Sequence, residues 1–124
     1  MSKLVLIAHP VAGNVKSNIE KILALCKEIH TIEIIPYVPY IAALHYLDDA
    51  IPEERALGMA VTKECFRRRS FDELWLCGPR ISSGMKEEIR LSLKYGVFVK
   101  CHNPALLPEF KKVIEEINTG TTYD

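Results

Sequence analysis

The sequence predicts an α/β fold in which one parallel sheet of about four strands lies between two layers of helices. Short apolar runs alternate along the chain with amphipathic segments, beginning with the run at residues 4–8. Helical crossovers between successive strands produce a parallel sheet that is covered on both faces. The length of 124 residues suits one domain over residues 1–124. We therefore expect a three-layer, doubly wound, flavodoxin- or Rossmann-like domain with strand order 2-1-3-4.

Four apolar segments are the predicted strands. Residues 4–8 are continuously apolar, which is typical of a strand buried on both faces. A second strand is expected at residues 33–38, where it ends at Pro39. The third and fourth strands are expected at residues 72–77 and 97–101.

The helices are predicted from apolar residues that recur on one face. In the helix expected at residues 14–30 they follow the spacing i, i+4, i+7, i+8, i+11 and i+14. Residues 40–52 are irregular, and Pro52 suits the first turn of a helix over residues 53–69. Gly96 ends the helix that follows Ser83. A last helix follows Asn103-Pro104. The residues expected to face the core from the second and last helices are Leu57, Ala60, Val61, Cys65, Phe66, Phe110, Val113, Ile114 and Ile117.

The composition argues against several classes of partner. Lys and Arg together number 16, as do Asp and Glu, so the charge balance favours neither nucleic acid nor an anionic membrane. No apolar stretch approaches the roughly 20 residues that span a membrane. The first residues do not have the pattern of a signal peptide, so we expect a cytoplasmic protein. The four cysteines lack metal-site spacing, so we expect no metal site. We also expect no cofactor.

The predicted ligand site lies at the carboxyl ends of the strands, near the switch point between the first and third. Residues 9–13, Pro39-Tyr40 and residues 78–84 follow those ends, and Asp49 lies in the irregular segment near the pocket mouth. His9 could contact a ligand or form a turn, Tyr40 could line a pocket or pack in the core, and Asp49 could cap a helix or bind hydroxyls. The predicted binding residues are His9, Pro10, Gly13, Tyr40, Asp49, Gly78, Ser82, Ser83, Gly84 and Met85.

The helix after this turn carries the candidate catalytic group. Backbone N–H groups at a helix start attract anions, although Ser83 could simply cap the helix. Glu88 shares the inward face of the helix with Met85 and Ser92, whereas Glu87 is expected at the surface. Burial would raise the pKa of Glu88 and the helix N-terminus would lower it. Whether its pKa is raised or lowered, Glu88 could act as a nucleophile or a base.

Three segments carry a resemblance to a known family. The sequences IAHPVAG, DELWLCG and SSGMKEEIRLSLKYG resemble the nucleoside 2-deoxyribosyltransferase superfamily, and the similarity extends over residues 3–99. It is closest to a bacterial and phage branch of that superfamily. The spacing from strand to GM-x-x-E, with a Gly eight residues after the Glu, is the most specific part.

The resemblance implies a function and roles for individual residues. Glu88 would attack C1′ of a deoxyribose, expel the base and hold the sugar as a covalent ester. Ser82 takes the position of a serine that contacts the 5′-phosphate in related nucleotide hydrolases, and Glu64 takes that of a carboxylate near the leaving base. Small-molecule nucleosides or nucleotides would be the substrates. A homo-oligomer, dimer or higher, is also implied, and residues 121–124 could contribute to a neighbouring site.

The chain also departs from that family. Leu6 stands where the family has a tyrosine that hydrogen-bonds the nucleophile. Pro10 and Ala12 stand where the hydrolases have a phosphate-contacting Ser and Arg, and Glu64 replaces an Asp. Two hypotheses follow: cleavage or transfer at the N-glycosidic bond of a nucleoside or nucleotide, or a non-catalytic module that binds a nucleotide or an ADP-ribose-like signal.

Overall fold

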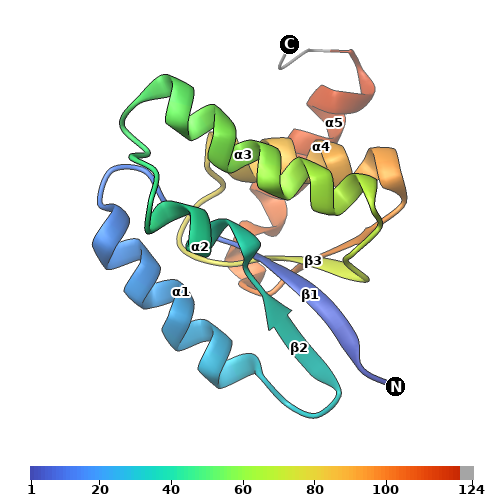
Figure 1. Cartoon of the computed structure of the whole chain (residues 1–124). Helices are drawn as coiled ribbons and strands as arrows, with labels where there is room; N and C mark the ends of the chain where they lie inside the picture. The colour runs from blue at the N-terminus through green and yellow to red at the C-terminus, as the bar shows by residue number, and fades with distance from the viewer. Residues whose placement is uncertain (121–124) are drawn as a thin grey trace.

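The computed structural model describes residues 1–120 and contains one four-stranded parallel sheet (Figure 1). Its order is β2-β1-β3-β4, which confirms the predicted arrangement. Each neighbouring pair is parallel, with β1 paired on one side to β2 and on the other to β3. The strands are β1 (Lys3–Ala8), β2 (Ile34–Tyr37), β3 (Glu73–Leu76) and β4 (Phe98–Cys101).

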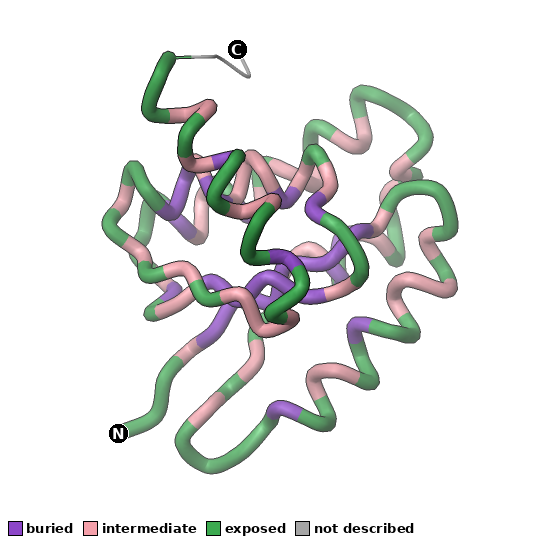
Figure 2. Tube along the Cα trace, turned by 180° about the vertical axis from the view of Figure 1, so that it is seen from behind, coloured by how far each residue is buried: buried purple, intermediate pink, exposed green. Residues whose placement is uncertain are grey.

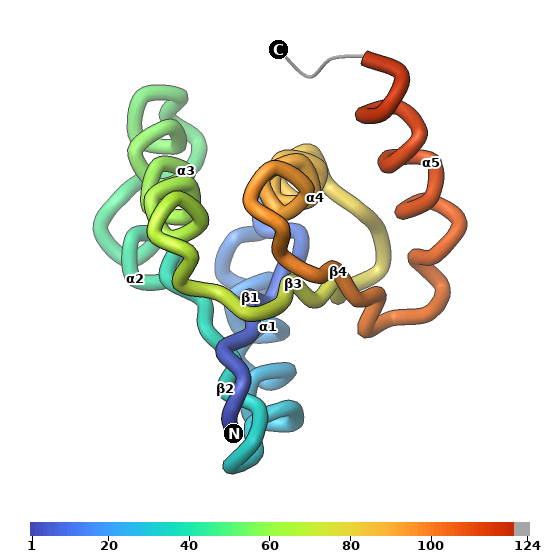
Figure 3. The backbone as a smooth tube through the Cα atoms, turned by 90° about the vertical axis from the view of Figure 1, so that its right-hand side faces the viewer, coloured from blue at the N-terminus to red at the C-terminus, as the bar shows by residue number. Residues whose placement is uncertain are grey.

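Helices form the outer two layers. Figure 3 shows the sheet edge-on, with α1 on one side and α3, α4 and α5 on the other. The last helix, α5, returns on the side of α4 and packs against the same core cluster. The helices are α1 (Val15–Ile29), α2 (Pro39–Leu44), α3 (Pro52–Arg67), α4 (Ser83–Tyr95) and α5 (Leu107–Asn118), with a 3-10 turn at Pro104–Leu106.

The core has two parts because the sheet is buried on both faces. Successive residues of β1 point to opposite layers, and all four from Val5 to Ala8 are fully buried. Leu6 and Ala8 pack on the side of α4, while Val5 and Ile7 pack on the side of α1. Figure 2 shows these buried strand segments at the centre of the molecule.

The structure corrects several predicted boundaries and faces. The segment predicted as irregular contains α2, which starts at Pro39 in the first helical position. Along α3, Leu57 is 60% exposed and Ala60 is also exposed, so their predicted inward orientation is wrong. Thr62 and Phe66 are the buried residues of this helix. The side of α3 that faces the pocket carries Arg55, Met59, Thr62 and Lys63 instead, so this inner face combines polar and apolar side chains.

No helix within residues 1–120 has both the length and the apolar character needed to cross a bilayer. Residues 121–124, which we expected to contribute to a neighbouring subunit, lie outside the described part of the chain.

Candidate functional site

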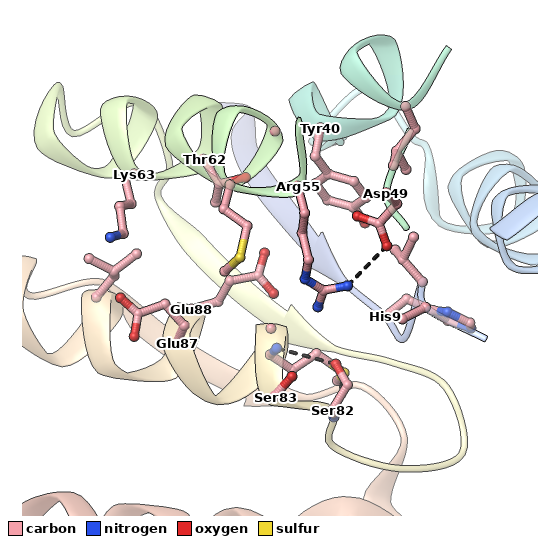
Figure 4. Close-up of a pocket in the computed structure, with 18 of the residues that line it drawn as sticks. His9, Tyr40, Asp49, Arg55, Thr62, Lys63, Ser82, Ser83, Glu87 and Glu88 are labelled. Atoms are coloured by element: carbon pink, nitrogen blue, oxygen red, sulfur yellow. Dashed lines mark hydrogen bonds and ion pairs between the residues drawn. The ribbon is translucent and has the colours of Figure 1, made fainter. Parts of the chain in front are cut away.

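A pocket of about 180 Å³ lies at the carboxyl end of the sheet, between α3 and the beginning of α4 (Figure 4). Its walls come from the segments after β1, β2 and β3, which is the region that the sequence predicted. Most predicted binding residues line it, together with the predicted nucleophile. They are His9, Tyr40, Asp49, Ser82, Ser83, Gly84, Met85 and Glu88.

The turn before α4 is held by a reciprocal cap. Ser82, not Ser83, is the N-cap: its Oγ accepts a hydrogen bond from the Met85 backbone N–H at 3.3 Å. The Ser82 N–H in turn donates to the Met85 sulfur at 3.5 Å. The first N–H groups of a helix have no partner carbonyl within that helix. In α4 these include the N–H groups of Ser83 and Gly84, and both residues line the pocket. This arrangement leaves polar backbone beside the cavity.

Glu88 projects from α4 into the space between α4 and α3 (Figure 4). The residue as a whole is half-buried because it faces the pocket, but protein crowds its carboxyl group on the other sides. Burial raises the pKa of Glu88 to about 8, and no nearby cation offsets that effect. Within residues 1–120 its carboxyl group forms no hydrogen bond or ion pair. The pocket therefore contains an acidic group without a partner.

Tyr40 is both a pocket wall and part of the packing. Its hydroxyl donates to the Ile7 carbonyl oxygen at 2.7 Å, which ties the start of α2 to β1. The ring contacts both core clusters. Burial, and then the charge of Glu88, raise the pKa of the Tyr40 hydroxyl well above its usual value. Tyr40 is therefore close enough to Glu88 for the two charges to interact. Tyr40 both lines the pocket and packs in the core, so the two predicted roles are compatible.

The sequence predicted Glu87 at the surface, and the structure corrects this. It lines the pocket, and its side chain is only 18% exposed. Arg90 Nε donates to its carboxylate at 2.9 Å. Hydrogen bonding to Arg90 lowers the pKa of Glu87, and the charge of Lys63 adds to the effect. The neighbouring carboxyls therefore differ, because Glu87 is paired and acidic whereas Glu88 is unpaired and weakly acidic.

A cation that the sequence did not predict also enters the pocket. Arg55 reaches from α3 toward the pocket, and its Nη1 lies 3.0 Å from Asp49 Oδ2 (Figure 4). Met59, Thr62 and Lys63 line the same wall. Relative to Arg55 their positions are i+4, i+7 and i+8, the spacing of one helical face. The sequence shows polar residues at this spacing (Arg55, Thr62 and Lys63), but a polar helix face usually faces solvent, so the spacing alone did not predict a pocket wall.

Glu64 is not brought into the pocket. It lies on α3, but its side chain is 45% exposed and bound to its own helix. Arg67 Nη2 and Arg68 Nε lie 2.6 Å and 2.7 Å from Glu64 Oε2. Their hydrogen bonds lower the pKa of Glu64 to about 2. Within a single chain Glu64 therefore does not line the pocket that contains Glu88.

Three predicted binding residues, Pro10, Gly13 and Gly78, are not among the residues that line the pocket. Gly78 has φ +84°, and a Cβ there would come within 2.9 Å of His9 Cδ2 and of Pro10 Cδ. The His9 Nδ1 donates to the Pro10 carbonyl at 2.7 Å. In Figure 4 the imidazole of His9 accordingly lies away from Glu88. These contacts join the ends of β1 and β3, so their main role is to shape the site.

The fold and the site define a class of protein: a doubly wound α/β domain with a small-molecule pocket at its topological switch point. Residues 3–102 match the family described as Domain of unknown function (DUF7768). The chain therefore belongs to that family. No curated protein and no solved structure matches it. Residues 1–120 contain no group of three or more His, Cys, Asp or Glu side chains that could share a metal ion.

Proposed function

We propose that the protein cleaves the N-glycosidic bond of a nucleoside or nucleotide, or transfers its 2-deoxyribosyl group, through a covalent ester on Glu88. The observation that carries this proposal is the unpartnered Glu88 carboxyl in the switch-point pocket. A carboxyl without an internal partner is available to a ligand. The resemblance to the nucleoside 2-deoxyribosyltransferases supports the same role for this residue.

The reaction would proceed by double displacement. The Glu88 carboxylate forms a bond to C1′ while the bond from C1′ to the base nitrogen breaks, and the base leaves with that electron pair. Water or a second base then attacks C1′ and releases the carboxylate, so the configuration at C1′ is retained. Since only the ionised carboxyl is a nucleophile and the pKa is about 8, activity at low substrate concentration should rise with pH up to that value.

The size of the pocket limits what it encloses. Its volume of about 180 Å³ is smaller than the roughly 300 Å³ at which ligand pockets for drug-sized molecules begin. We infer that it encloses a group the size of a pentose, with the rest of the ligand at the mouth. Ser82, Ser83 and Gly84 lie beside this space and supply hydroxyl and backbone N–H groups for a sugar or phosphate oxygen.

The test uses pooled nucleosides and nucleotides with mass spectrometry of both products and protein. The wild-type protein should release free base and carry a sugar adduct on the peptide that contains Glu88, whereas Glu88→Gln should do neither. Glu87→Gln is the matched control because it removes the adjacent, paired carboxylate. Equal release of base by wild type and Glu88→Gln would exclude this mechanism.

A second candidate is a module that binds a nucleotide or an ADP-ribose-like signal without turning it over. The high pKa of Glu88 favours it, because a protonated carboxyl can donate a hydrogen bond to a ligand. The hydroxyl of Tyr40 is already engaged by Ile7, so it is not free to hold the nucleophile. Ligand binding that survives Glu88→Gln, with no product formed by wild type, would support this alternative.

Self-association in a cytoplasmic setting is a further part of the proposal, and it comes from the resemblance. Light scattering of the purified protein should give a mass of at least two chains, and a monomer at all concentrations would contradict this expectation.

A further inference from the structure

Arg55 and Asp49 both line the pocket and form an ion pair with each other. Glu87, which also lines the pocket, is paired instead with Arg90 of an adjoining hollow. Asp49 comes from the segment between α2 and α3, and Arg55 from the first turns of α3. Their side chains are 15% and 35% exposed, so the carboxylate is the more deeply placed partner. The guanidinium is therefore held at the pocket while part of it stays accessible.

Arg55 also belongs to a second, shallow hollow that adjoins the pocket. Ser83, Gly84 and Glu87 line both spaces, so the two are continuous. The cations that line the hollow are Arg55, Lys63, Lys86 and Arg90, and Glu87 is the carboxylate among them. With Asp49, which pairs with Arg55, the cations outnumber the carboxylates four to two, and such an excess favours a bound anion.

The chemistry of the pair leaves donors for a ligand. The Arg55 side chain is 35% exposed while it is bound to Asp49, so part of its guanidinium can be reached without breaking the ion pair. A guanidinium presents five N–H donors in a planar fork that matches two phosphate oxygens, and Asp49 engages only one Nη of Arg55. A phosphate at the junction of pocket and hollow could thus bind Arg55 while Asp49 keeps its side chain in place.

We propose that Arg55 is the residue that makes this site prefer a phosphorylated ligand over the corresponding neutral one, and that Asp49 positions it. The inference rests on the proposed function in one respect, since it takes the ligand to be a nucleoside or nucleotide. It places the phosphate at Arg55 on the wall formed by α3, at the junction where Ser83 and Gly84 also line both spaces.

The experiment measures binding without turnover, in the Glu88→Gln background, by isothermal titration calorimetry. The probes are the 2′-deoxynucleoside 5′-monophosphates and their nucleosides. Adding Arg55→Gln should weaken monophosphate binding by about tenfold or more, as expected when a charge-assisted bidentate contact is lost, and leave nucleoside binding within about twofold. Arg55→Lys should restore part of the preference, because a point charge remains.

Two further variants separate charge recognition from structure. Asp49→Asn should reduce the preference for monophosphates less than Arg55→Gln does, because the guanidinium remains but is no longer held. Arg67→Gln is the matched control on the same helix, since Arg67 binds Glu64 outside the pocket. It should leave both affinities unchanged. Raising the salt from roughly 50 mM to 500 mM should reduce the preference for monophosphates over nucleosides in the Glu88→Gln parent protein. It should have little effect when Arg55→Gln is added.

The outcomes distinguish this inference from the proposed function. Equal loss of monophosphate and nucleoside binding in Arg55→Gln would overturn the phosphate role, as would a parent that shows no preference for monophosphates. A preference that depends on Arg55, with no base released by wild type, would support this inference and contradict the proposed catalysis. If the wild type and the Glu88→Gln parent both bind neither class of probe, and the wild type releases no base, both proposals are overturned.

Discussion

Replacing Glu88 by glutamine should remove a strong pH dependence of protein stability. Burial raises the pKa of Glu88 to about 8 from the ordinary value of 4.5. The folded protein therefore binds this proton more tightly than the unfolded chain does. This contribution to stability is fully present below the ordinary pKa and is lost as the pH rises through the folded-state value. Glutamine is neutral at every pH and has nearly the same shape, so it isolates the effect of ionisation.

The size of the effect follows from the two pKa values. Linkage between pKa and folding gives about 3 kcal/mol of stability from Glu88 at about pH 5.5 and close to zero at about pH 8.5. The free energy of unfolding of the wild type, measured relative to Glu88→Gln, should therefore fall by about 3 kcal/mol across that range. The groups that both proteins share titrate alike and cancel in the difference.

Urea denaturation at a series of pH values measures this difference directly. Glu87→Gln is the control, because hydrogen bonding to Arg90 lowers the pKa of Glu87. Its contribution to stability is present above the ordinary carboxyl pKa and is lost only as the pH falls through the lowered value. It should therefore add no slope in this range. A difference between wild type and Glu88→Gln that varies by less than about 0.5 kcal/mol would refute the assignment of a buried, unpaired carboxyl to Glu88.

Three further substitutions test how the site is supported, each by chemical denaturation. Gly78→Ala should destabilise the fold by about 2–4 kcal/mol, since the new Cβ meets His9 and Pro10 at a positive φ; wild-type stability would contradict this. Tyr40→Phe should cost about 1 kcal/mol through the lost hydrogen bond to Ile7, and an unchanged midpoint would mean that this bond adds nothing. Ser92→Ala should be neutral or stabilising by up to about 1 kcal/mol, because the buried Ser92 hydroxyl has no hydrogen-bond partner in the described chain; a clear loss would reveal an unseen partner.

Much of the fold could be predicted because burial leaves a direct pattern in the sequence. The continuous apolar run of β1 indicated a strand buried on both faces, and its residues from Val5 to Ala8 are fully buried. Alternation of strands with amphipathic helices predicted parallel pairing. The order 2-1-3-4, expected for a flavodoxin-like sheet, is the observed order β2-β1-β3-β4. The short helix α2 was missed because its six residues are too few to show a period.

The candidate site could be predicted only where backbone position determines it. The residues of the Ser82 turn follow β3 and begin α4, so chain order alone brings them to the pocket. The position of Glu64 depends instead on the orientation of α3 about its axis. That orientation turns Arg55 and Thr62 toward the pocket, while the ion pairs of Glu64 with Arg67 and Arg68 lie outside it.

The sequence by itself determined the fold class, the end of the sheet where the pocket lies, and the helix that carries Glu88. Each of these depends on local periodicity and on the order of elements along the chain. Only the tertiary structure decided that Glu88 is unpaired while Glu87 is bound by Arg90, and that Arg55 meets Asp49. The Glu87–Arg90 and Asp49–Arg55 pairs join residues that are close in sequence. Their place at the pocket, and the burial of Glu88, depend instead on how α3 packs against α4, and periodicity contains no information about that packing.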